Sequence, residues 1–170
     1  MISLKTAYYY ILAVKINFTK TIKKIYFTTK FYKKSLISKV PSQFFFFPNP
    51  FLMSFFSNYR KFAFQTNNLD PNNFWTQRYS NKEKKELHDF LWLSSIDRKD
   101  DASTLRKIIS LWNQDNLKYK SLIWETSIIS RRIMSWILNA DIILKNSNFE
   151  FKRNFIESIV IQTNHLKRNF

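Results

Sequence analysis

The sequence contains no glycine and no cysteine among its 170 residues. Phosphate-cradling loops, nucleophile elbows and dinucleotide-binding turns need glycine, because they require a positive φ or a close approach of the backbone. Without cysteine the chain has no disulfide, no thiol nucleophile and no thiolate metal site. The composition therefore excludes nucleotide-loop proteins, serine hydrolases and cysteine enzymes, while abundant Phe, Lys, Asn and Ile indicate AT-rich coding.

Candidate metal ligands and paired carboxylates are also scarce. The only two histidines, His88 and His165, are far apart and lack paired ligand spacing, so we expect no metal site and no cofactor. Asp97, Asp100 and Asp101 gather at a predicted helix start, where helix capping explains them better than acid–base catalysis. The sequence therefore identifies no catalytic residue.

Acidic residues are absent from the first part of the chain. Residues 1–69 contain 11 Lys and Arg and no Asp or Glu, whereas residues 70–170 contain 17 and 12, for a net charge of +16. A basic field of this kind attracts acidic polysaccharide, nucleic acid or anionic lipid headgroups. The charge alone leaves all three partners open.

The chain has no long apolar run near its start. The stretch from Ala7 to Val14 is too short to span a bilayer, and no small-residue cleavage site follows it, so it does not fit a secretory signal. Four lysines between positions 15 and 24 accompany apolar residues, which predicts a basic amphipathic helix over roughly Tyr8 to Phe31. We expect this N-terminal segment, residues 1–40, to pack on a larger body or to rest on a charged surface.

A second segment, residues 41–79, is rich in Phe, Pro and Asn. Pro41, Pro48 and Pro50 enclose a run of four phenylalanines, and a polar cluster follows at 67–73. Proline breaks a continuous helix, so the pattern predicts an irregular connector that covers the core of another part of the chain.

Residues 80–170 show helical periodicity and helix caps. Capping boxes stand at Ser80–Glu83 and Ser147–Glu150, Asp100 or Asp101 can cap a helix between them, and Asn146 can end one in place of glycine. The expected core positions are Leu87, Phe90, Leu91 and Ser94, then Leu105, Ile108, Ile109 and Trp112, then Ile129, Ile133, Trp136, Ile137, Ala140, Ile143 and Leu144, and finally Phe151, Phe155, Ile159 and Leu166. Four helices with short connections predict an all-α fold, an antiparallel helical array.

Within the third predicted helix lies the pattern W-x5-S-x-R-x3-W, formed by Trp124, Ser130, Arg132 and Trp136. Arg132 and Trp136 are four residues apart and share one helix face, where a guanidinium beside an indole suits a sugar ring and its carboxylate. The same spacing fits a second interpretation, in which both tryptophans are core residues and Arg132 is a structural arginine. The spacing leaves both interpretations open.

Three segments of the chain form a combined pattern: Leu-His-Asp-Phe-Leu-Trp-Leu at 87–93, Trp124, and Ser-Arg-Arg-Ile-Met-Ser-Trp at 130–136. In this order and spacing they resemble the N-terminal helical region of heparinase II/III-like polysaccharide lyases. The likeness covers about residues 55–170. It implies an incomplete α/α toroid, which in this family precedes a β-sandwich, and a chain that stops inside the toroid. Where the family commonly has glycine around the arginine, this chain has Arg131 and other bulky residues.

The resemblance also implies a function. Lyases of this family cleave uronate-containing polysaccharides by β-elimination, which needs positioned bases and acids. No stretch of this chain matches the family's catalytic His, Asn and Tyr residues, so we expect the isolated chain to be inactive. The resemblance places Trp124, Arg132, Trp136 and His88 at the substrate cleft and Ser130 in structural support.

Partners and compartment follow from the same resemblance. They are an acidic polysaccharide, the remaining C-terminal part of the same enzyme, and the cell envelope or periplasm. Because residues 165–170 end without a helix cap, we expect the gene to continue beyond Phe170. The alternative function is a basic helical RNA-binding or ribosome-associated protein, since lysines and aromatic residues are interleaved in the first segment. That alternative, together with the lack of a clear cleavable signal, keeps the cytoplasm open.

Overall fold

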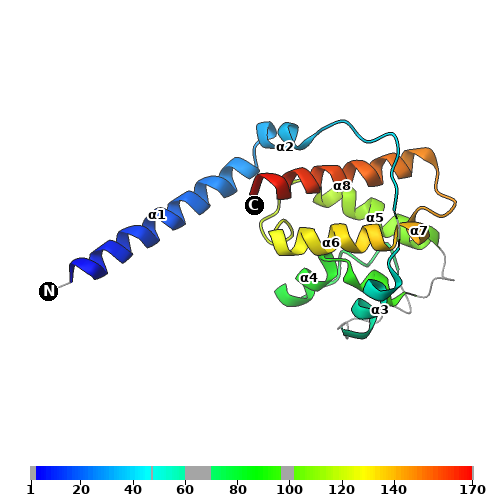
Figure 1. Ribbon diagram of the computed structural model, residues 1–170, viewed down its shortest axis with the longest axis horizontal. Helices are drawn as coiled ribbons and strands as arrows, with labels where there is room; N and C mark the ends of the chain where they lie inside the picture. The colour runs from blue at the N-terminus through cyan, green and yellow to red at the C-terminus, as the bar shows by residue number, and fades with distance from the viewer. Residues whose placement is uncertain (1–2, 47, 60–69, 97–101, 170) are drawn as a thin grey trace. The chain divides into compact units, whose positions relative to one another are not determined.

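The computed structural model describes residues 3–46, 48–59, 70–96 and 102–169 (Figure 1). These residues form helices and no strand, so the predicted all-α class is confirmed. The chain divides into two compact units, Met1–Ser35 and Leu36–Phe170. The predicted cap at Asp100 or Asp101, and Asp97 beside it, lie outside the described residues.

The first unit consists of α1 (Leu4–Phe27) and most of α2 (Lys30–Leu36). α1 begins earlier than predicted, because the Ser3 side chain accepts a hydrogen bond from the backbone N–H of Thr6 and caps the helix. It ends where two successive threonine hydroxyls donate to carbonyls of its last turn, before position 30. No residue of α1 is buried.

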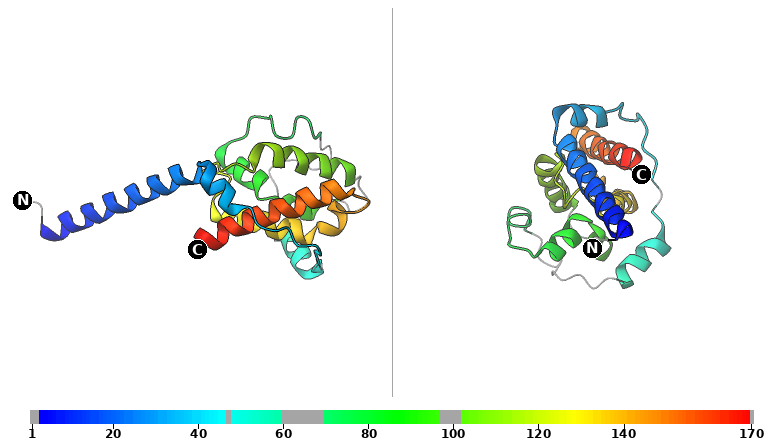
Figure 2. Two further views of the ribbon diagram at one scale, coloured as in Figure 1. Left: turned by 90° about the horizontal axis from the view of Figure 1, so that it is seen from above. Right: turned by 90° about the vertical axis from the view of Figure 1, so that its left-hand side faces the viewer.

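The second unit begins with an extended segment that runs beside the last helix, α8 (Phe149–Asn169), as Figure 2 shows. The Asn164 amide donates to the carbonyl oxygen of Leu36 at 2.8 Å and lies 3.0 Å from the Ser38 hydroxyl. These bonds fasten the extended segment to α8.

A short helix, α3 (Pro50–Tyr59), forms inside the segment that was predicted to be irregular. The Asn49 side chain accepts hydrogen bonds from the backbone N–H groups of Phe51 and Leu52, and Pro50 occupies the first helical position, where its missing N–H costs nothing. Proline therefore begins a helix here, and α3 packs against a 3-10 helix, η1 (Leu91–Ser95).

The remaining helices of this unit are α4 (Asn81–His88), α5 (Ala102–Asn116), α6 (Thr126–Leu138) and α7 (Ala140–Ile143). The predicted capping box at Ser80 is confirmed, with Glu83 as its reciprocal partner. α6 and α8 lie side by side and run in opposite directions (Figures 1 and 2), and α5 packs on α7 and α8. α6 and α8 are thus an antiparallel pair, whereas α5 runs in the same direction as α8, with Arg106 near Lys145 and Asn113 near Ser158.

Two predicted helices are interrupted. The first ends at His88, because Phe90 adopts a left-handed conformation with φ 59° and the Asp89 carboxylate accepts the N–H of Leu91. The third breaks at Asn139, whose amide donates to the Ser135 carbonyl. With no glycine in the chain, nothing in the sequence marks these two turns.

The start of α8 also differs from the prediction. The Asn148 side chain accepts the backbone N–H of Phe151 at 2.8 Å, while the Ser147 hydroxyl donates to the carbonyl of Leu144. The cap is therefore Asn148, and the predicted box on Ser147 is wrong. Asn146 has φ 54°, which confirms that asparagine takes the left-handed position after the preceding helix.

Large apolar side chains from α4, η1, α5, α6, α7 and α8 form the core of Leu36–Phe170. The most deeply buried of these side chains are Leu87, Phe90, Trp92, Ile108, Ile109, Trp112, Ile129, Trp136, Ile143 and Phe155. All but Trp92 stand at predicted core positions, because helical spacing identified the inner faces correctly.

Candidate functional site

Arg132 of α6 lies at the centre of the predicted constellation, and it is completely buried. Its Nε donates to Oε1 of Gln162 at 2.6 Å, and its Nη1 donates to the carbonyl oxygen of His88 at 2.8 Å. Nη1 and Nη2 also reach the carbonyl oxygen of Ile123, at 3.3 and 3.4 Å. The guanidinium carbon stands 4.3 Å from the centre of the Trp112 ring. One side chain therefore links α4, the loop before α6, and α8.

Arg132 keeps its positive charge although it is buried. Desolvation lowers the pKa of Arg132 to about 9, and the nearby carboxylate of Asp89 opposes the shift. Asp89 is itself fully buried, and one of its oxygens lies 3.7 Å from Nη1 of Arg131. At neutral pH the guanidinium stays protonated, and it is compensated by hydrogen bonds, a ring face and a carboxylate.

His88 is a neutral hydrogen-bond acceptor in this cluster. Its Nδ1 accepts the indole N–H of Trp112 at 2.9 Å, and the Trp75 ring stacks on it at 5.2 Å. Burial, and then the positive charge of Arg132, lower the pKa of His88 to about 3. An imidazole with so low a pKa is a weak base, and its Nδ1 is already occupied.

The two tryptophans of the pattern are core residues in the structure. Trp124 is 2% exposed, and its indole N–H donates to the carbonyl of Asn116 at 2.9 Å. Trp136 is fully buried, with its ring 5.4 Å from that of Trp112 and 5.2 Å from that of Phe90, both edge to face. Such pairs stabilise a core beyond their buried area.

Ser130 lies on the exposed side of α6. Its hydroxyl donates to the carbonyls of Thr126 and Ser127, one turn earlier in the same helix. The structure therefore gathers His88, Trp124, Arg132 and Trp136 in the interior and leaves Ser130 apart from them. This burial favours the second interpretation of the pattern, in which Arg132 is structural and the tryptophans are core.

Sequence reasoning missed two polar members of the cluster. Gln162 is fully buried and also donates to the Ser158 carbonyl, and His165 packs its ring 5.0 Å from that of Trp124. Burial lowers the pKa of His165 to about 4. The available signal was positional: Gln162 lies three residues after Ile159, and His165 lies three residues after Gln162, in the same predicted helix.

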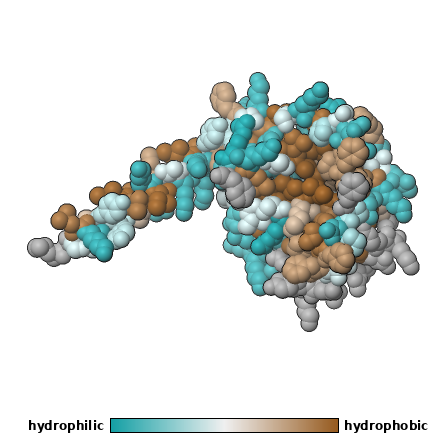
Figure 3. All heavy atoms as spheres, viewed as in Figure 1, coloured by the Kyte–Doolittle hydropathy of each residue, from teal (hydrophilic) through white to brown (hydrophobic). Residues whose placement is uncertain are grey.

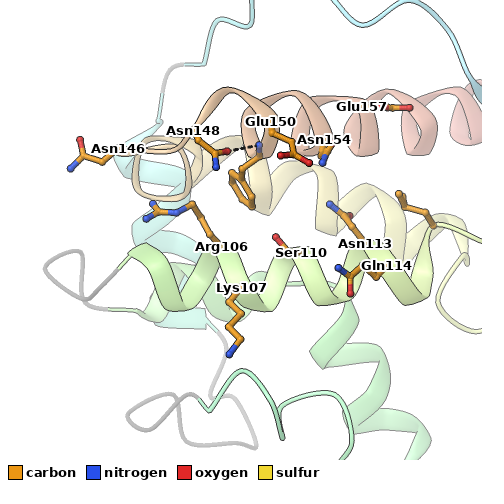
Figure 4. A pocket seen from close by; sticks show the side chains of 12 residues that line it. Arg106, Lys107, Ser110, Asn113, Gln114, Asn146, Asn148, Glu150, Asn154 and Glu157 are labelled. Atoms are coloured by element: carbon orange, nitrogen blue, oxygen red, sulfur yellow. Dashed lines mark hydrogen bonds between the residues drawn. The ribbon is translucent and has the colours of Figure 1, made fainter.

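A surface groove lies elsewhere, between α5 and the first turns of α8. This groove, of about 720 Å³, is lined mainly by amide, hydroxyl and charged side chains (Figure 4). Arg106 is anchored at one end by a 2.7 Å bond from its Nη1 to the carbonyl of Lys145. Asn113 and Asn154 face each other across the groove, and the Lys107 side chain points away from it. These groups can hydrogen-bond a hydroxyl-rich ligand.

Within the part of the chain that the structure describes, no three His, Asp or Glu side chains are grouped so that they could hold a metal ion.

No helix among the described residues combines the length and apolar character that crossing a membrane requires.

Comparison with protein-family models, with curated proteins and with solved structures found no match.

Proposed function

We propose that Leu36–Phe170 is the N-terminal helical part of a heparinase II/III-like lyase that acts on uronate-containing polysaccharide by β-elimination. The observation that carries the proposal is the bonding of Arg132. Arg132 lies in the third segment of the resemblance. Its guanidinium donates to the carbonyl of His88, which lies in the first segment, and to the carbonyl of Ile123, which is next to Trp124, the second segment.

This bonding gives a physical reason for the spacing of the three segments. A buried guanidinium needs several acceptors at fixed positions, and two of its acceptors here are backbone carbonyls from distant parts of the chain. A sequence pattern centred on a buried arginine is therefore better evidence for a fold than for a binding site. The opposite directions of the neighbouring helices α6 and α8 support the toroid part of the proposal, because a toroid is built from antiparallel helix pairs.

In this proposal the polysaccharide contacts the groove between α5 and α8 rather than the buried pattern. Amides at Asn113 and Asn154 suit sugar hydroxyls, and Arg106 can meet a uronate carboxylate. The catalytic base and acid come from another part of the enzyme, which is the partner that the proposal requires.

The test is binding of uronate oligosaccharides and of neutral glucans of equal length, measured by calorimetry. Arg106→Gln should lower uronate affinity about tenfold, since it removes a charge-assisted hydrogen bond. Asn154→Trp should block the groove. Arg153→Gln removes the same charge from an exposed position outside the groove and should change little. Equal affinity for charged and neutral glycans, or equal effects of the two arginine variants, would contradict the proposal.

The assignment of catalysis to another part of the enzyme has its own test. The purified chain should produce no unsaturated uronate, which absorbs in the ultraviolet. Steady, heat-sensitive production by the 170-residue chain would show that catalytic residues lie within it.

The alternative, RNA binding, depends on the basic first unit rather than on Leu36–Phe170. Salt-sensitive retention of RNA on a filter, with no binding of acidic glycans, would favour that alternative.

A further inference from the structure

α1 is an uncovered helix with apolar side chains in water. It is about 36 Å long by its 24 residues, and none of them is buried. Figure 3 shows apolar side chains uncovered along it. Met1–Ser35 also contains eight lysines and no acidic residue. Exposed apolar surface on this scale marks an interaction surface.

Six apolar side chains of α1 lie on one face, because they stand three, four or seven residues apart. The members of this apolar face and their exposed fractions are Leu4 93%, Ile11 67%, Val14 51%, Phe18 66%, Ile22 49% and Ile25 63%. The face runs the whole length of the helix.

The lysines are placed around this apolar face. By helical spacing Lys5, Lys20, Lys23 and Lys24 lie beside and behind it, all of them exposed. Lys15 lies within it, but its four-carbon stem can cover apolar surface while the ammonium reaches outward. Tyrosines flank the face as well, and a ring with a polar tip suits a boundary between apolar and aqueous surroundings.

We propose that α1 lies in the surface of an anionic lipid bilayer. The apolar face enters the boundary between headgroups and acyl chains, and the lysines bind the lipid phosphates. The apolar face of α1 thus matches the acyl chains, and its lysines match the anionic headgroups.

Two other partners, a second copy of the chain and a nucleic acid, would contact only part of the surface of α1. A second copy of α1 would place five lysines against five lysines with no acidic residue between them. A nucleic acid would satisfy the lysines and the aromatic rings but would leave Ile11 and Ile22 in water. Only the lipid surface uses both sides of the helix.

The first experiment is flotation of the full chain with phosphatidylcholine vesicles that contain or lack phosphatidylglycerol. We expect the chain to float with the anionic vesicles and to dissociate as salt rises. The triple variant Lys20→Gln, Lys23→Gln and Lys24→Gln should lower the partition coefficient roughly a hundredfold. A matched variant removes three exposed lysines of the second unit, at Lys82, Lys118 and Lys152, and should bind within about threefold of the parent.

The second experiment separates insertion from charge attraction. Ile11→Ser removes apolar surface from the apolar face and should weaken binding about tenfold. Ile16→Ser makes the same change on the lysine side of α1, where Ile16 is 45% exposed, and should leave binding unchanged within about twofold. Urea unfolding of each variant confirms that Leu36–Phe170 stays folded.

Flotation with anionic vesicles that depends on Ile11 and not on Ile16 supports the proposal. It is overturned by a lack of flotation, by equal effects of the two isoleucine changes, by RNA retention without flotation, or by a dimer in solution that requires Ile11. None of these results depends on glycan binding by the groove, so the membrane proposal and the lyase proposal fail separately.

Discussion

Arg132 in Leu36–Phe170 and the lysines of α1 in Met1–Ser35 are all cations beside aromatic or apolar side chains, yet only Arg132 is buried. Arg132 meets carbonyl and amide oxygens at fixed distances, so its charge serves the fold. The lysines of α1 belong to a helix that buries none of its residues. In this chain the role of a cationic side chain therefore depends on the hydrogen-bond acceptors around it and not on its residue type.

The strongest test of this comparison is the loss of Arg132. Arg132→Met would leave the Gln162 oxygen and two buried carbonyls without a donor, which should cost about 4 kcal/mol of unfolding free energy. The neighbouring Arg131 has a side chain that is 44% exposed, so Arg131→Met should cost about 1 kcal/mol or less. Urea denaturation measures both, and similar costs would show that Arg132 is not the centre of the core.

Acidification should destabilise the second unit. The pKa values of His88 and His165, about 3 and about 4 in the folded chain, lie below the value near 6.5 of an unfolded histidine. Between these pKa values the unfolded chain binds more protons than the folded chain. The contribution of the two histidines to the unfolding free energy is therefore complete above pH 6.5 and decreases as the pH falls.

From pH 7 to pH 5.5 we expect a loss of about 2.5 kcal/mol from the two groups together. Urea denaturation at the two pH values measures it, and the imidazole resonances should stay those of neutral rings in the folded chain. Met1–Ser35 contains no histidine, so the helicity of α1 should not change with the second unit. A constant unfolding free energy over this range would contradict the buried, neutral state of both rings.

Two buried tryptophans sharpen the comparison within the core. Trp112→Phe removes the donor to His88 and the larger ring beneath Arg132, and should cost about 2 kcal/mol. The indole N–H of Trp136 makes no hydrogen bond within the described residues, so Trp136→Phe should cost about 1 kcal/mol, from lost packing. Thermal denaturation ranks the pair, and the reverse order would mean that packing outweighs the hydrogen bond.

The smallest expected effect belongs to α1. Replacing Lys20, Lys23 and Lys24 by glutamine should change the unfolding free energy of Leu36–Phe170 by less than about 0.5 kcal/mol, because these side chains are exposed. Urea denaturation of the full chain, followed by tryptophan fluorescence, reports on this unit, which holds all five tryptophans. A loss above about 1 kcal/mol would show that the lysines contribute to the fold after all.

The sequence predicted the helical class and most of the inner faces, because apolar spacing and the Ser80 cap are local signals. It did not predict the turn at Phe90 or the break at Asn139, where larger residues take the place of the expected glycine. α3 was missed because Asn49 and Pro50 also fit an irregular segment.

The hydrogen-bond partners of Arg132 could not be predicted from local sequence patterns, for a different reason. Spacing placed Trp136 at a core position and Arg132 on the same face, but did not show whether Arg132 is buried beside Trp136 or reaches a ligand. The acceptors are backbone carbonyls, which every residue has, and an amide at Gln162, 30 residues later. The groove between α5 and α8 likewise depends on how two helices meet, which no single stretch of sequence records.

The bonds of Arg132 also set a condition on the order of folding. Its acceptors lie 44 residues before it, at His88, and 30 residues after it, at Gln162. Until the ribosome has released Gln162, the guanidinium Nε–H cannot enter the core with its hydrogen-bond acceptor, so we expect α4, α5 and α6 to close only together with α8. We therefore expect a nascent chain halted before Gln162 to remain open to proteases, and the whole unit to close in one cooperative step.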